Sequence, residues 1–419
     1  MEALVGKGKG LAVRSSTPIE YNPRNFCKGR MNKMMRALNL AVAFASFASS
    51  IPARAGESSL TFIIEDALRD KIQGAWTGML IGGLEGLAHE FKYIAQPRET
   101  LPDFSPSIAG GARSDDDNDF ELTHLYFMDK LGVLKIPYEQ IVDIWKTNMN
   151  DGIWCANKEA RALMDEGVVP PATGDPARNS FASFNLSGQF AVEMYGAVSP
   201  GMPSAACDLG LHYASIAVSG EPLQAARYWT SLVSLAALHT GPIEDVITVA
   251  LNATNPKSAH AEVVRDAIRV YHDHPGDWKA ARQVIYNRWL IDRKWNQNST
   301  PSNGGLVILA LLFGQEDFYR TLQYAMAMGL DADCNAATAG AVLGMKNGYK
   351  QFAALPGFDL SDTYTNKTRP GLPRVMKISD QVDLFMRVCE RTVLANGGRR
   401  EVVGGTPGYQ IARQQPSSD

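Results

Sequence analysis

Apolar residues recur at three- and four-residue spacing along most of the chain, from Leu60 to about Asn396. This period is typical of amphipathic helices, and Gly, Pro and Asp mark the loops between them. No break rich in Pro or Ser divides the region, so we expect a single compact, multi-helix, all-α domain over residues 56–396. The clearest helical segments are Asn118–Leu131, Tyr138–Asn148, Leu223–Leu238, Ala259–Tyr271, Trp278–Leu290, Phe318–Met328, Asn335–Tyr349 and Ser379–Asn396.

The hydrophobic pattern changes after about Gly397. Few alternating, strand-like runs occur in the chain, and Val402–Ile411 is the best candidate for a strand. We therefore assign residues 397–419 to a C-terminal tail that forms a short ribbon or is partly disordered.

Two of the helical segments carry small residues at every fourth position. A glycine in a helix interior costs about 1 kcal/mol relative to alanine, and close approach of another helix can offset that cost. We expect both helices to be buried near the centre of the domain. The small residues are Gly74, Gly78, Gly82 and Gly86 in one segment and Ala336, Gly340, Gly344 and Gly348 in the other.

The charge is divided unevenly along the chain. The sequence has 41 Lys+Arg and 44 Asp+Glu, a net charge of −3. Residues 1–55 hold nine of the basic residues and two of the acidic ones (net +7), which leaves 32 basic and 42 acidic residues (net −10) in 56–419. The near-neutral total argues against a nucleic-acid-binding protein, which usually has a basic excess. The 45% hydrophobic content excludes a mostly disordered chain.

The basic N-terminal leader, residues 1–55, ends in a segment that resembles a secretory signal peptide, residues 31–55. Lys33 and Arg36 form its positive region, an apolar core follows over Ala37–Ser49, and Ala53-Arg54-Ala55 fits the A-x-A cleavage pattern. The alternative is an amphipathic first helix of the domain. With cleavage near Ala55 the protein would be secreted or periplasmic, and no later apolar run is long enough for a membrane anchor.

An aspartate run, Asp115-Asp116-Asp117, precedes a helical pattern. Such a run is typical of a solvated loop or helix N-cap, but carboxylate oxygens are also the ligands that Mg²⁺, Mn²⁺ and Ca²⁺ prefer. Asp331 and Asp333 form a second acidic pair at the start of the small-residue helix. Two acidic clusters at helix starts would together neutralise one or two divalent cations.

Glu90 closes the Gly-rich segment that begins at Gly82. A carboxylate at the end of a buried helix can act as a general acid or base. From spacing alone, a surface residue is the simpler interpretation.

Together these segments resemble the ADP-ribosylglycohydrolase family. Gly78–Phe91 resembles the family motif G-x-x-x-G-D-A-x-G-x-x-x-E-[FY], Asp115–Asn118 resembles T-D-D-T, and Gly329–Gly344 closely matches G-x-D-[TS]-D-[TC]-N-A-x-x-A-G-x-x-x-G. The motifs occur in the family's order, and the resemblance spans roughly residues 74–348. It implies an all-α fold with a binuclear Mg²⁺ centre, or Mn²⁺ in its place. Ca²⁺ is a further option because carboxylates also bind it.

The resemblance also implies roles for individual residues. Asp116 and Asp117 match the metal-binding aspartates of T-D-D-T, and Asp331 and Asp333 match those of the late motif. Glu90 matches the family's glutamate, which helps bind the ribose and is implicated in proton transfer. We expect metal ligands at Asp115, Asp116, Asp117, Asp331 and Asp333, catalytic roles for Glu90, Asp117 and Asp333, and substrate contacts from Glu90, Asn118 and Asn335.

The sequence departs from the family pattern at several positions. Asp115 and Asn118 replace the two Thr of T-D-D-T, unless the register shifts by one and Ser114 takes the place of the first Thr. Gly83 stands where the family has Asp, and Cys334 takes the Cys rather than the Thr of the [TC] position. A thiol is a soft ligand that Mg²⁺ would not select, so these changes bear on the metal and on the substrate.

We therefore predict a metal-dependent glycoside hydrolase that cleaves the anomeric bond of an ADP-ribosyl or related ribose-like furanoside. An export signal favours a different sugar, from an extracellular glycan or a nucleoside, because ADP-ribosylated proteins are mainly intracellular. Two alternatives remain: a non-catalytic, crystallin-like member of the fold, and a Ca²⁺-stabilised helical binding module. The partner is a small molecule or a glycan.

Three further features give no firm assignment. The aromatic segment Trp145–Trp154 can pack in the core or line a cleft, and we favour the core. Asn185 and Asn298 begin N-x-[ST] sequences that fit glycosylation. The cysteines are widely spaced and predict neither a zinc site nor a particular disulfide.

Overall fold

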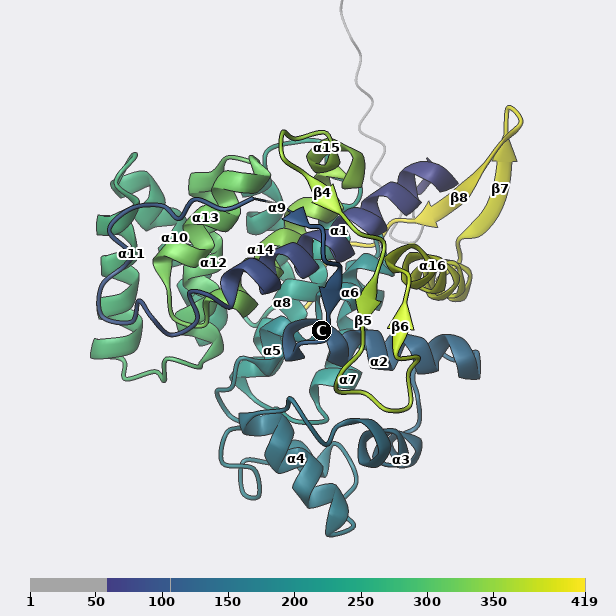
Figure 1. Ribbon diagram of the computed structural model, residues 1–419, viewed down its shortest axis with the longest axis horizontal. Helices are drawn as coiled ribbons and strands as arrows, with labels where there is room; N and C mark the ends of the chain where they lie inside the picture. The colour runs from purple at the N-terminus through teal and green to yellow at the C-terminus, as the bar shows by residue number, and fades with distance from the viewer. Residues whose placement is uncertain (1–58, 106, 419) are drawn as a thin grey trace, which may run out of the picture. The chain divides into compact units, whose positions relative to one another are not determined.

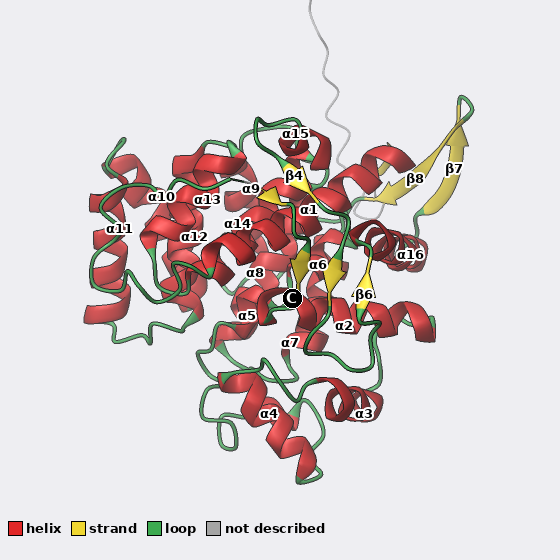
Figure 2. Ribbon diagram, in the orientation of Figure 1, coloured by secondary structure: helices red, strands yellow, loops and turns green. Residues whose placement is uncertain are grey.

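A computed structural model describes residues 59–105 and 107–418. The predicted leader and signal peptide lie outside these residues. Most of the described chain is helical, and the strands are few and short (Figures 1 and 2). The described residues form one domain, which confirms the predicted all-α fold class. None of the described helices combines the length and apolar character needed to cross a membrane.

The helices follow one another through the chain with short connections. The first half contains α1 (Glu65–Gly86), α2 (Asp116–Leu131), α3 (Tyr138–Asn148), α4 (Cys155–Asp165), α5 (Ser187–Phe190), α6 (Glu193–Ala197), α7 (Pro203–Ala214), α8 (Glu221–Ala236) and α9 (Ile243–Ala250). The second half contains α10 (Ala259–Asp273), α11 (Trp278–Tyr286), α12 (Thr300–Gly314), α13 (Phe318–Met328), α14 (Ala332–Asn347), α15 (Tyr349–Ala353) and α16 (Ile378–Ala395). Short 3₁₀ and π turns cover Ala172–Gly174, Leu251–Ala253 and Asn287–Asp292.

The predicted helical segments agree with these bounds to within a few residues. Two of them, Tyr138–Asn148 and Phe318–Met328, coincide with α3 and α13. The largest difference is at Trp278–Leu290, where the α-helix ends at Tyr286 and continues as a π turn. The sequence pattern does not distinguish these two helix types, because the apolar positions continue through both.

Three small sheets accompany the helices. In the first, β8 (Thr406–Ala412) lies between β1 (Leu60–Ile64) and β7 (Arg399–Val403), and both pairings are antiparallel. The others join β2 (Ser107–Ile108) to β4 (Asp359–Leu360), and β3 (Ala112–Arg113) to β5 (Tyr364–Thr365) and β6 (Val375–Met376).

The first sheet corrects one expectation and extends another. Helical structure was expected from Leu60, but β1 occupies Leu60–Ile64 because its backbone pairs with β8. The tail forms the predicted ribbon, and the β7–β8 hairpin extends beyond the helices in Figure 1. Pairing with β1 connects the tail to the start of α1.

Helices α1 and α14 pack together at the centre of the fold (Figure 1). Their small residues face one another: a Cβ added at Gly78 would lie 2.3 Å from the carbonyl oxygen of Gly340, and one at Gly82 would lie 2.2 Å from that of Ala336. At the end of this contact, a Cβ at Gly86 would lie 2.3 Å from Cα of Asp333. The predicted central burial of both helices is confirmed, and the close contact fixes the first turn of α14.

Candidate functional site

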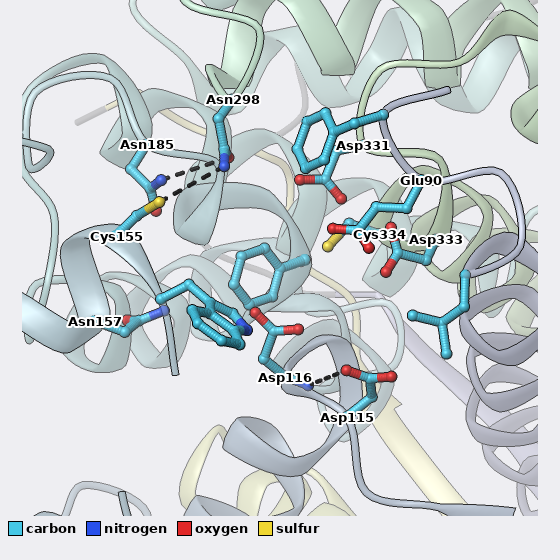
Figure 3. Close-up of a pocket in the computed structure, with 14 residues that line it drawn as sticks. Glu90, Asp115, Asp116, Cys155, Asn157, Asn185, Asn298, Asp331, Asp333 and Cys334 are labelled. Carbon is cyan, nitrogen blue, oxygen red and sulfur yellow. Dashed lines mark hydrogen bonds between the residues drawn. The ribbon is translucent and has the colours of Figure 1, made fainter. Parts of the chain in front are cut away.

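A cavity of about 250 Å³ opens where the end of α1 meets the starts of α2, α4 and α14 (Figure 3). Side chains from widely separated parts of the sequence surround it. Carboxylates form one part of its wall, and amides with aromatic rings form the other. The lining residues are Leu87, Glu90, Phe91, Asp115, Asp116, Trp154, Cys155, Asn157, Asn185, Phe190, Asn298, Asp331, Asp333 and Cys334.

Asp115 and Asp116 reach the cavity from the start of α2. Asp115 is the N-cap residue, and its Oδ1 accepts a hydrogen bond from the backbone N–H of Asp116 at 3.0 Å. The Asn118 side chain completes a capping box by accepting from the N–H of Asp115 at 3.4 Å. Negative charge is favourable at a helix N-terminus, so the same position that caps the helix also presents carboxylates to the cavity.

Asp331, Asp333 and Cys334 reach the cavity from the start of α14. Their ligand atoms, one from each side chain, all lie within 4.8 Å of one another, and all three residues are buried. The turn before them is unusual, because Gly329 and Leu330 both have positive φ angles, 80° and 59°. A non-glycine residue in this region is strained, and the turn directs the following carboxylates inward.

Glu90 lies in the turn that follows α1 and faces the same space in Figure 3. The backbone N–H of Phe91 donates to the carbonyl oxygen of Leu330 at 2.8 Å, which ties this turn to the start of α14. Burial raises the pKa of Glu90 to about 7, and the nearby negative charges of Asp333 and Asp115 add to the effect.

The carboxylates strongly influence one another. Burial is the largest cause that raises the pKa of Asp116, Asp331 and Asp333. Neighbouring aspartates raise the pKa of Asp116 and Asp331 further, whereas a hydrogen bond with Asp331 lowers that of Asp333. Among the described residues that line the cavity there is no Lys, Arg or His to balance the charge. Oδ1 of Asp333 is buried and has no hydrogen-bond partner in the described part of the chain. An oxygen-rich set with an unpartnered oxygen fits a divalent cation.

Asp117 lies behind the cavity wall rather than on it. It is buried, and its carboxylate points at α1, where a Cβ on Gly83 would lie 2.1 Å from Oδ2. The absence of a side chain at Gly83, where the family pattern has Asp, therefore makes room for Asp117. Three aspartates of this run were expected to bind metal, and two of them, Asp115 and Asp116, line the cavity.

This placement favours the register in which Ser114 corresponds to the first Thr of T-D-D-T. In that register the two central aspartates are Asp115 and Asp116, the pair that lines the cavity. Ser114 itself does not line it: its Oγ accepts a hydrogen bond from the backbone N–H of Lys367 at 2.8 Å.

Asn118 and Asn335, the expected substrate contacts, are also buried behind the wall. Oδ1 of Asn118 accepts a hydrogen bond from the Tyr364 hydroxyl at 2.7 Å. The amide of Asn335 donates to Oδ1 of Asn303 at 2.9 Å and accepts from Gln189 at 3.1 Å. Because internal partners occupy both amides, these residues are placed to hold the starts of α2 and α14 rather than to touch a ligand.

The wall opposite the carboxylates was not identified from the sequence. Trp154 is 60% exposed and lines the cavity, whereas Trp145 is in the core, so the expectation for this aromatic segment holds for only one of its ends. Asn157, Asn185 and Asn298 lie on this side (Figure 3). Asn185 and Asn298 stood out in the sequence only as possible glycosylation sites. No sequence pattern marked Asn157 as a functional residue.

Helix α2 is anchored through a buried histidine. Nε1 of Trp145 donates to Nε2 of His124 at 2.9 Å, so Nδ1 carries the ring proton and donates to the Tyr195 hydroxyl at 2.7 Å. Burial lowers the pKa of His124 to about 3, with smaller contributions from His212 and Arg369. The imidazole is therefore neutral at physiological pH.

The four described cysteines are Cys155, Cys207, Cys334 and Cys389, and all are free thiols. Two of them, Cys155 and Cys334, line the cavity. Burial and the four surrounding aspartates raise the pKa of Cys334 well above its usual range.

Comparison with known proteins bears on the identity of this site. A search of curated proteins found no match. Among the matching solved structures is one described as an ADP-ribosylglycohydrolase-related protein complex, which is 16% identical, covers 78% of this chain and 99% of its own, and has a TM-score of 0.49. The family model for ADP-ribosylglycohydrolase matches residues 64–377, which include every residue that lines the cavity. The chain belongs to the ADP-ribosylglycohydrolase family.

Proposed function

We propose that this protein is a divalent-metal-dependent glycoside hydrolase that cleaves the anomeric bond of a ribose-like furanoside. Family membership supports a glycohydrolase. The observation that carries the rest is that Glu90 and four aspartates, from three separate segments, line one cavity. Carboxylates in such numbers are costly to bury without a counter-charge, so their arrangement favours a cationic cofactor.

Asp115, Asp116, Asp331 and Asp333 would hold the metal, one or two ions of Mg²⁺ or Mn²⁺. When bound, such an ion supplies Lewis acidity, orients sugar hydroxyls and lowers the pKa of water. The two aspartate pairs are fixed at helix starts, and α14 is held against α1 by backbone contact. The chain therefore provides a rigid set of ligands, as a catalytic site requires.

Glu90 is placed for proton transfer. It is the one cavity carboxylate outside the two aspartate motifs, and the Phe91–Leu330 hydrogen bond keeps its turn beside Asp331. Glycosidic cleavage passes through an oxocarbenium-like transition state, and a carboxyl group protonates the departing oxygen or takes a proton from water. We assign this proton transfer to the carboxyl group of Glu90.

The remaining wall suits a sugar ring and its leaving group. The amides of Asn157, Asn185 and Asn298 can donate to and accept from hydroxyls, and the exposed indole of Trp154 offers a flat apolar surface. Stacking of an aromatic ring on such a surface stabilises a complex by about 0.5–1.5 kcal/mol, in addition to the free energy gained by burying apolar area.

The same wall favours a neutral substrate over a diphosphate. The cavity of about 250 Å³ is smaller than the roughly 300–1,000 Å³ typical for drug-sized ligands. No cationic side chain occurs among the described lining residues, so no side chain of the cavity would offset the charge of a diphosphate. An uncharged furanoside, such as a nucleoside or a glycan-derived sugar, is the second candidate substrate beside an ADP-ribosyl group.

A substrate panel with and without metal tests the proposal. Metal-free protein is assayed on aryl furanosides, nucleosides and ADP-ribosyl compounds, alone and after addition of Mg²⁺ or Mn²⁺. We expect hydrolysis of at least one class, abolished by EDTA and restored by the metal. Activity that persists in EDTA contradicts metal dependence. Metal or sugar binding without turnover on any substrate would instead support the crystallin-like alternative, and a Ca²⁺-dependent melting temperature without turnover would support the binding module.

A further inference from the structure

Cys334 supplies the one soft ligand atom in the acidic cluster. Its Sγ and one carboxylate oxygen each from Asp331 and Asp333 lie within 4.8 Å of one another. The residue is 4% exposed, so the thiol is almost fully enclosed. A sulfur and two oxygens at this separation can contact one ion.

The position of Cys334 is fixed by the fold. The Thr338 hydroxyl donates to the Cys334 carbonyl oxygen at 2.9 Å, within the first turns of α14. The preceding residue, Asp333, packs against Gly86 of α1, where a Cβ would lie 2.3 Å from Cα of Asp333. The backbone that carries the thiol is therefore held in place by the packing of α14 against α1.

A second observation points to a ligand at this place. Oδ1 of Asp333 is buried and has no hydrogen-bond partner among the described residues, although Asp333 is only 4% exposed. A buried carboxylate oxygen without a partner is costly. In Figure 3 the Asp333 carboxylate and the Cys334 sulfur face the same space beside Asp331.

We propose that Cys334 is a direct metal ligand and makes this a mixed oxygen and sulfur site that prefers Mn²⁺, Co²⁺ or Zn²⁺ to Mg²⁺. Thiolate sulfur selects softer, later divalent ions, whereas Mg²⁺ prefers oxygen ligands alone. On binding, the S–H bond breaks, a metal–sulfur bond forms, and the thiol proton passes to the solvent. This inference rests on the proposed metal-dependent function and specifies its metal.

Cobalt titration of the metal-free full-length protein tests the assignment directly. We expect a near-ultraviolet thiolate-to-cobalt charge-transfer band in the native protein and its absence in Cys334→Ser and Cys334→Thr. Cys155→Ser is the matched control, because Cys155 lines the same cavity but lies outside the cluster. That variant retains the band.

Metal competition gives a second measurement. The ratio of Zn²⁺ to Mg²⁺ affinity, measured by calorimetry, falls at least about ten-fold in Cys334→Thr, since losing even an outer partner of a metal ligand costs 10–100-fold. The Cys155→Ser ratio is unchanged.

The outcomes separate this inference from the proposed function. Bound cobalt without a charge-transfer band in the native protein, or a band that survives in Cys334→Ser, overturns the thiolate ligand and leaves metal-dependent hydrolysis standing. If the band depends on Cys334 but the protein hydrolyses no substrate, the result supports Cys334 as a metal ligand and contradicts the proposed hydrolase function. If no divalent ion binds at all, both fail.

Discussion

The two walls of the cavity are built in different ways. The acidic wall comes from helix starts and from the turn after α1, and close contact between α1 and α14 holds it in place. The amide and aromatic wall comes from the start of α4 and from segments just before α5 and α12, and its largest side chain, Trp154, is mostly exposed. Rigid elements suit groups whose geometry must be held for chemistry, and loops suit groups that determine which substrate is accepted.

Removing one carboxylate from the acidic wall should have the largest effect. We expect Asp333→Asn and Asp116→Asn to lower kcat/KM by at least about 1,000-fold, since a lost metal ligand removes several kcal/mol of transition-state stabilisation. Metal content and steady-state kinetics measure it. Asp208→Asn, whose side chain is exposed on α7, is the control and should keep full activity. Normal metal content and activity in Asp333→Asn would contradict the assignment of this wall.

Separating α1 from α14 should be the next largest effect. In Gly340→Ala the new Cβ would lie 2.1 Å from the carbonyl oxygen of Gly78, and overpacking of this kind costs about 1–3 kcal/mol or more. We expect a lower melting temperature together with weaker metal binding, because the start of α14 carries two of the five carboxylates of the acidic wall. Gly110→Ala is the control, since a Cβ there has open space. Equal stability of the two variants would show that the helices can move apart without cost.

Acid should weaken the anchoring of α2. The pKa of His124 is about 3 in the folded protein, below the ordinary histidine value of 6.5, because the ring is buried. A lowered pKa favours the neutral form, so the stability it contributes is present above pH 6.5 and is lost as pH falls towards 3. Between pH 7.5 and 5 we expect a loss of about 2 kcal/mol.

Urea unfolding of the native protein and of His124→Gln at both pH values measures this contribution. The difference between the two proteins isolates His124 from buried carboxyl groups, whose raised pKa values act in the opposite direction. An identical pH dependence in both proteins would contradict the prediction.

Changing the second wall should have the smallest effect and a different kinetic signature. We expect Trp154→Ala to raise KM about ten-fold for the best aryl furanoside, through lost stacking, while kcat changes less than about two-fold. Ile291→Ala, an exposed apolar residue outside the cavity, is the control. A fall in kcat with unchanged KM would show that Trp154 acts in the chemical step, like the acidic wall. It would contradict the proposed difference between the two walls.

The sequence by itself determined the helical elements and the three motif segments. Helix bounds followed from local periodicity, as at α3 and α13, since the apolar stripe that predicts a helix is the same stripe that the core buries. The strand β1 was missed because its pairing with β8 joins residues some 350 positions apart in the chain.

Only the tertiary structure decided which residues of those motifs meet. Asp115 enters the cavity from the extended N-cap position, and Asp116 enters it from the first residue of α2. The next side chain is rotated by about 100° around the helix, so Asp117 turns towards Gly83 instead. The opposite wall gathers Trp154, Asn185 and Asn298 from loops far apart in sequence. A local pattern carries no information about such neighbours, because packing of distant elements, and not the spacing of residues, brings them to one cavity.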